Sequence, residues 1–151
     1  MKKLVVVFLM GTMLGCIHKP SGPVTAWERV TTENAVFAQT LDTTKQGVIA
    51  AQTSMLITTA QAKPILEFTS QVATIQQQIN RILAQAPSSS SIPVLQSLVA
   101  QINTSAQALV TNGALGIKNP KSQQNIGADI QAIVNSAQVI MTSYAAATGG
   151  R

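Results

Sequence analysis

The chain has 151 residues, ten basic and five acidic side chains, and a formal net charge of +5. Hydrophobic residues make up 46% of it and aromatic residues only 3%, with one histidine and one cysteine. This length allows one domain with a modest core. The basic residues are scattered without interleaved aromatics, a pattern that argues against nucleic-acid binding. A single cysteine excludes an internal disulfide.

The first residues of the chain have the layout of a secretory signal peptide. Lys2 and Lys3 form a positively charged region, and an apolar stretch follows over residues 4–14. This stretch is too short to cross a bilayer, which needs about 20 apolar residues. We therefore expect residues 1–15 to be a removable signal peptide rather than a permanent transmembrane helix.

The end of this segment resembles the lipobox of bacterial lipoprotein precursors, and the resemblance covers residues 1–16 only. Gly15 places a small residue before the thiol of Cys16, while Met13 and Leu14 stand where the family usually has leucine and a small residue. The resemblance implies cleavage after Gly15 and a lipid on Cys16, the first residue of the mature chain. The alternative is an ordinary signal peptide cut near Gly15, with a cysteine there by chance.

The same resemblance implies an exported protein that is held at a membrane and faces the periplasm. In the family, the residue after the cysteine influences sorting, and Ile17 is not the aspartate that often retains such proteins at the inner membrane. The outer membrane is therefore the expected location. A lipid on Cys16 also removes a free thiol, which is a liability in an oxidising compartment.

Beyond the leader, residues 16–23 hold the cysteine and a short tether, in which Pro20, Gly22 and Pro23 oppose helix formation. From residue 24 onward apolar residues recur at alternating spacings of three and four, which is a helical pattern. We expect residues 24–148 to form an all-α domain, an antiparallel four-helix bundle. The four stripes are Trp27, Val30, Asn34, Phe37, Leu41, Thr44, Val48, Ala51 and Met55; Ile65, Phe68, Val72, Ile75, Ile79, Ile82 and Ala86; Ile92, Leu95, Val99, Ile102, Ala106 and Leu109; and Ile126, Ile130, Ile133, Ala137, Ile140 and Tyr144.

Helix-breaking residues separate the later stripes. Residues 86–91 form a serine-rich linker, and Asn112-Gly113 is typical of a helix stop. Asn119-Pro120 is typical of a helix start, with asparagine as the N-cap and proline as the first helical residue.

The sequence leaves two possibilities for the path of the chain between the first and second stripes. Pro64 either starts a second helix after a tight turn or kinks one very long helix, and residues 59–63 contain no typical turn residue. We favour reversal, since the stripes must be buried against one another. The first helix is then the longest, about 58 Å over residues 24–62 if residues 41–47 do not break it.

A first helix longer than its neighbours protrudes beyond them and exposes an apolar stripe near its start. Such stripes are usually covered by a partner. The predicted interaction stripe consists of Trp27, Val30, Asn34, Phe37 and Leu41. Two of these residues have a second interpretation, since Asn34 could set the register of a buried seam and Trp27 could pack near Tyr144 at the base of the last helix.

The sequence offers little for catalysis. His18 lies in the tether, which is a poor place for a preorganised base. The carboxylates show neither a facing pair for glycoside hydrolysis nor a calcium loop, and no cysteine or histidine pair has ligand spacing. We therefore expect no enzyme, no cofactor and no metal. The five carboxylates are Glu28, Glu33, Asp42, Glu67 and Asp129.

These observations lead to the hypothesis of a lipid-anchored cell-envelope protein with a structural or protein-interaction role. Its expected partners are the membrane, through the lipid on Cys16, and an envelope protein or a second copy of the chain. One alternative is a helical carrier of an apolar ligand, which would need a cavity between the helices. Another is a phage-encoded lipoprotein that acts in lysis or in the exclusion of other phages.

Overall fold

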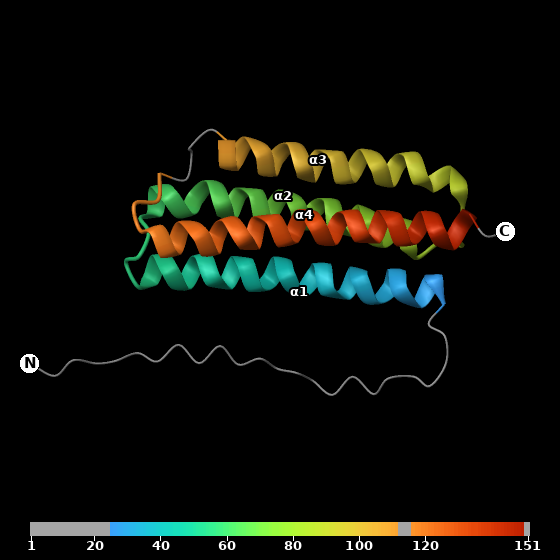
Figure 1. Ribbon diagram of the computed structural model, residues 1–151, viewed down its shortest axis with the longest axis horizontal. Helices are drawn as coiled ribbons and strands as arrows, with labels where there is room; N and C mark the ends of the chain where they lie inside the picture. The colour runs from blue at the N-terminus through green and yellow to red at the C-terminus, as the bar shows by residue number, and fades with distance from the viewer. Residues whose placement is uncertain (1–24, 112–115, 150–151) are drawn as a thin grey trace, which may run out of the picture.

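The computed structural model describes residues 25–111 and 116–149, which form four α-helices and one turn of 3-10 helix. The elements are α1 (Ala26–Thr53), α2 (Thr59–Leu83), η1 (Ser89–Ser91), α3 (Ile92–Thr111) and α4 (Pro120–Gly149). Figure 1 shows that each helix runs antiparallel to the next one in the chain. The predicted all-α four-helix bundle is confirmed.

The helices form a ring in chain order, because α1 packs against α2 and α4, and α3 packs against the same two helices. The pairing of α1 with α4 is the most extensive. The start of α1, the α2–α3 connection and the end of α4 lie together at one end of the bundle, which we call the proximal end (Figure 1). The turn over residues 54–58 and the start of α4 lie at the other end, the distal end.

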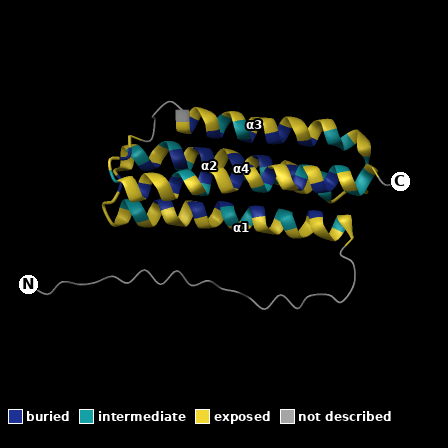
Figure 2. Ribbon diagram, viewed as in Figure 1, coloured by how far each residue is buried: buried dark blue, intermediate teal, exposed yellow. Residues whose placement is uncertain are grey.

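Most of the core of the bundle comes from the predicted stripes (Figure 2), although Met55 of the first stripe is exposed and five hydrophobic residues outside the stripes are also buried: Ile57, Ala62, Leu98, Ile117 and Val134. All six members of the fourth stripe are buried, and the second and third stripes are buried except near their ends. Fully burying a large aliphatic side chain contributes roughly 1.5–3 kcal/mol. The stripes are therefore the main source of stability, and the sequence pattern that predicted them is confirmed.

A capping box starts α1. The hydroxyl of Thr25 accepts a hydrogen bond from the Glu28 amide at 3.1 Å, and the Thr25 amide donates to the Glu28 carboxylate at 2.7 Å. The two bonds give hydrogen-bond acceptors to the backbone amides of Thr25 and Glu28, which have no partner within the helix. From there α1 continues unbroken to Thr53, so the break considered for residues 41–47 does not occur.

A Schellman motif ends α1. The Leu56 amide donates to the Ala51 carbonyl at 2.9 Å, and the Met55 amide donates to the Gln52 carbonyl at 3.0 Å. This pair of bonds satisfies carbonyls that the last helical turn leaves free. Met55 stands at the left-handed position that glycine usually holds, with φ of +56°.

The chain reverses over residues 54–58, which are upstream of the segment that the sequence analysis assigned to the turn. A second capping box starts α2, since Thr58 accepts from the Gln61 amide at 3.3 Å and its own amide donates to the Gln61 side chain at 2.8 Å. Pro64 then lies inside α2. Reversal is confirmed, but its predicted place at Pro64 is wrong, because these caps position the turn earlier and α2 continues through Pro64. One very long helix through residues 54–58 does not occur.

The early reversal also corrects the predicted helix lengths. α1 has 28 residues, and α4, with 30, is the longest of the four described helices. The prediction that the first helix is the longest is therefore wrong. The predicted start of the last helix is confirmed, since α4 begins at Pro120 and the Asn119 side chain accepts from the Ser122 amide at 3.0 Å. Asn112 and Gly113 lie outside the described residues.

Replacing Met55 with glycine is expected to stabilise the fold. A left-handed backbone costs a residue with a Cβ about 1–2 kcal/mol, and the Met55 side chain is 92% exposed, so it contributes little packing. Part of the gain is offset by the greater freedom of glycine in the unfolded chain. We expect Met55→Gly to raise the free energy of unfolding by about 1 kcal/mol, measured by urea denaturation. Met55→Leu is the control and should leave stability unchanged; a glycine variant no more stable than this control would contradict the account of the turn.

Candidate functional site

The predicted interaction stripe lies in the core rather than on the surface. Val30 and Phe37 are 0% exposed and Leu41 is 6% exposed. Trp27 and Asn34 are half-buried. α4 lies beside α1 along the bundle (Figure 1) and supplies the most extensive packing against it. The prediction of an exposed stripe is therefore wrong. Because α1 ends at the turn over residues 54–58 and is no longer than α4, it does not protrude beyond its neighbours.

An aromatic cluster closes the proximal end. The rings of Trp27 and Tyr144 meet edge to face, with their centroids 6.0 Å apart. Tyr144 is fully buried, and its hydroxyl donates to the Ser88 carbonyl at 3.2 Å and accepts from the Ser88 amide at 3.1 Å. These contacts join α1, α4 and the α2–α3 connection. The alternative prediction that Trp27 packs near Tyr144 is confirmed.

A polar contact crosses between α1 and α2 in the same half of the bundle. The Asn34 side-chain amide donates to the Asn80 side-chain oxygen at 2.8 Å. The other polar atom of Asn34, its Oδ1, is buried without a hydrogen-bond partner. A buried acceptor left unpaired costs about 1–3 kcal/mol. The pair therefore aligns α1 with α2 at some cost in stability.

Matched leucine substitutions at Asn34 and Asn80 are expected to have opposite effects. Asn34→Leu removes the buried, unpaired oxygen and leaves the exposed Asn80 amide free to hydrate, so we expect a gain of about 1 kcal/mol in the free energy of unfolding. Asn80→Leu keeps that oxygen and also deprives the Asn34 amide of its acceptor, so we expect a loss of about 1 kcal/mol. Urea denaturation of both variants checks the order, and a reversed order would rule out the assigned roles.

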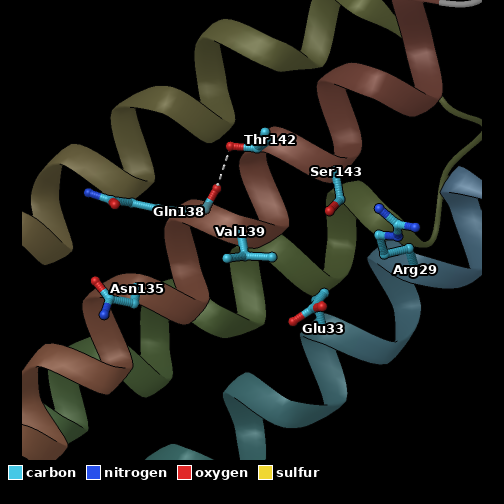
Figure 3. Close-up of a pocket in the computed structure, with 7 residues that line it drawn as sticks. All are labelled: Arg29, Glu33, Asn135, Gln138, Val139, Thr142 and Ser143. Atoms are coloured by element: carbon cyan, nitrogen blue, oxygen red, sulfur yellow. Dashed lines mark hydrogen bonds between the residues drawn. The ribbon is translucent and has the colours of Figure 1, made fainter.

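The larger surface groove lies between α1 and α4, with a volume of about 600 Å³. Figure 3 shows that two charged side chains come from α1 and that the others come from α4. The Thr142 hydroxyl donates to the Gln138 carbonyl at 3.0 Å within α4. The lining residues are Arg29, Glu33, Asn135, Gln138, Val139, Thr142 and Ser143. The groove is thus lined mostly by polar residue types, is open to solvent, and includes one basic and one acidic side chain.

A second groove of about 390 Å³ lies between α1 and α2. Its floor is more apolar, since Leu66 packs against the core and Ile49 is 40% exposed. Asp42 and Lys45 line it as well. Like the first groove, it is a surface feature between two neighbouring helices.

The described carboxylates do not converge on a reactive centre. Hydrogen bonds from the backbone amide and hydroxyl of Thr25 lower the pKa of Glu28, and burial raises the pKa of Asp129. Lys63 and Glu67 form an exposed ion pair on α2, with 3.9 Å between the nitrogen and oxygen. Within residues 25–111 and 116–149, no three histidine, cysteine or acidic side chains are grouped closely enough to hold a metal ion.

An exposed apolar and basic surface occupies the distal end, and sequence reasoning missed its apolar part. Met55 is 92% exposed and Leu56 is 49% exposed. Three exposed lysines, Lys63, Lys118 and Lys121, lie at the starts of α2 and α4. We call these five residues the distal tip. The sequence analysis had placed Met55 in the first buried stripe. The capping box formed by Thr58 and Gln61 was the sequence signal that could have shown that the first helix ends before this residue.

Hydrogen bonds and buried neighbouring residues fix the backbone of the distal tip. The Gln61 side chain donates to the Gly116 carbonyl, which joins the start of α2 to the chain before α4. Ile57 and Ile117 are buried directly beside the exposed residues. The Gln52 side chain also donates to the Thr59 hydroxyl across the turn, at 3.1 Å. The tip is therefore a fixed part of the bundle.

The predicted cleavage and lipid sites, Gly15 and Cys16, lie outside the described residues, as do the tether and His18. Among the helices that the structure describes, none combines the length and the hydropathy needed to cross a membrane. Comparisons with protein-family models, with curated proteins and with solved structures gave no match for this chain.

Proposed function

We propose that the protein is a lipid-anchored lipoprotein of the bacterial cell envelope, with a structural or protein-interaction role for its helical bundle. The observation that carries the proposal is Gly15-Cys16 at the end of a basic and apolar leader. The proposal includes export, a lipid on Cys16, and a location at the outer membrane with the bundle facing the periplasm.

The geometry of the bundle is compatible with such an anchor. Cys16 precedes the first residue of α1, Ala26, by ten positions. Ten residues of extended chain reach about 35 Å at most. A lipid on Cys16 would therefore hold the proximal end, with the Trp27–Tyr144 cluster, within that distance of the membrane.

The chemistry of the larger groove supports an interaction role. Arg29, Glu33 and the amides of Asn135 and Gln138 offer a cation, an anion and neutral hydrogen-bonding groups along one face. Protein contacts commonly combine such polar groups around a few apolar side chains, here Val139, which is 41% exposed. Because this groove is open to solvent, it favours a protein surface over the alternative of an apolar ligand carried between the helices.

Substituting Cys16 is expected to abolish the anchor. The protein is isolated from a bacterial membrane fraction and its intact mass is measured, beside Cys16→Ser and the tether control Ser21→Ala. We expect the unchanged chain and Ser21→Ala to begin at Cys16 and to carry the mass of a diacylglyceryl group and an acyl chain. Cys16→Ser should lack that mass, because serine has no thiol to form the thioether.

An unmodified chain cut near Gly15, or one that still carries Met1, would refute the anchor and the outer-membrane location with it. If the lipid is present, cross-linking in the intact envelope identifies the partner. A band at twice the mass of the chain indicates self-association, and a mixed band indicates a different envelope protein.

A further inference from the structure

The distal tip exposes an apolar side chain in a conformation that works against the stability of the fold. Met55 holds the left-handed position of the Schellman motif, where glycine is unstrained. Its side chain is 92% exposed, and the neighbouring Leu56 is 49% exposed. The fold therefore gains neither an unstrained backbone nor buried apolar surface from this methionine. A contact of Met55 with something outside the bundle would account for its presence at this position.

The charge around these two residues has one dominant sign. Lys63, Lys118 and Lys121 are exposed at the same end, and residues 43–66 and 68–128 contain no aspartate or glutamate. Glu67 is the ninth residue of α2, which places it about 12 Å along the helix from its start. Its contact with Lys63 is long and solvent-exposed, so it leaves the ammonium group available to another anion.

An apolar projection within a set of lysines matches the surface of an anionic bilayer. Apolar side chains gain by entering the boundary between headgroups and acyl chains, and lysines gain from the negative surface potential. The tip also projects from the end of the bundle at a turn (Figure 1), so it can reach a flat surface without obstruction by neighbouring helices.

We propose that the distal tip is a non-covalent binding site for anionic phospholipid membranes, into which Met55 and Leu56 insert while the three lysines contact the headgroups. This site lies at the opposite end of the bundle from the start of α1, and the inference does not depend on a lipid at Cys16.

A fluorophore at residue 55 tests the insertion directly. The full chain carries Cys16→Ser, so that Met55→Cys is its only thiol, and this thiol is labelled with an environment-sensitive nitrobenzoxadiazole group. The labelled chain is mixed with vesicles of phosphatidylglycerol and phosphatidylcholine, or of phosphatidylcholine alone. The matched control carries the label at the exposed Gln101, in the middle of α3, and it reports any response of the label that does not depend on its place at the distal tip.

We expect a blue shift and a gain in emission from residue 55 with the anionic vesicles, reduced by high salt, and no such change from residue 101. Changing Lys63, Lys118 and Lys121 to glutamate should raise the vesicle concentration needed for the residue-55 signal by at least about 100-fold. Circular dichroism shows whether this variant keeps its helices, and the triple glutamine variant, with a smaller loss, serves if it does not.

The glycine variant separates binding from folding. With the label moved to Leu56→Cys, Met55→Gly should reduce the blue shift on anionic vesicles although the fold does not lose stability. A general loss of structure cannot produce that combination.

Three results would overturn the proposal. They are a label at residue 55 that stays in a water-like environment, an equal response to vesicles of phosphatidylcholine alone, and a blue shift without vesicles that grows with protein concentration. The last result would assign the tip to a second copy of the chain. Because every variant lacks Cys16, none of these results bears on the lipoprotein proposal, which the mass measurement tests separately.

Discussion

The reversal of the chain after Thr53 is the constraint on which the rest of the structure depends. It rests on a Schellman motif that ends α1 and a capping box at Thr58 that starts α2, with only residues 54–58 between the two helices. Because these local hydrogen bonds stop α1 before Pro64, four helices of comparable length lie side by side and each apolar stripe faces the others.

The reversal also decides which surfaces are available to a partner. It leaves Val30 and Phe37 buried in the core, while Met55 and Leu56 are exposed in the turn between α1 and α2. The Trp27–Tyr144 cluster, in contrast, closes the proximal end next to the point where the chain enters the bundle. The two ends therefore differ in chemistry, since the proximal end has the Trp27–Tyr144 cluster and the distal end has the apolar and basic distal tip.

The sequence predicted the stripes well because isoleucine and valine recur at helical spacing with few exceptions, as from Ile126 to Ile140, and burial follows from that period. It placed the first turn incorrectly because Pro64 is a conspicuous residue, whereas the cap formed by Thr58 and Gln61 looks like ordinary polar sequence. The grooves and the distal tip depend on which helix ends meet in space, and no local pattern encodes that. The lipid site at Cys16 is a local motif, so it was predictable from sequence alone and remains a prediction.

A distance between α1 and α2 tests the reversal most directly. Spin labels are attached in the Cys16→Ser chain at Ala35→Cys and Arg81→Cys, two exposed positions that neighbour Asn34 and Asn80, and the distance is measured by double electron–electron resonance. Adjacent helices, with axes about 8–10 Å apart, predict a label separation of about 25 Å or less. A continuous helix through Pro64 would separate these positions by about 69 Å, and a distribution near that value would contradict the bundle.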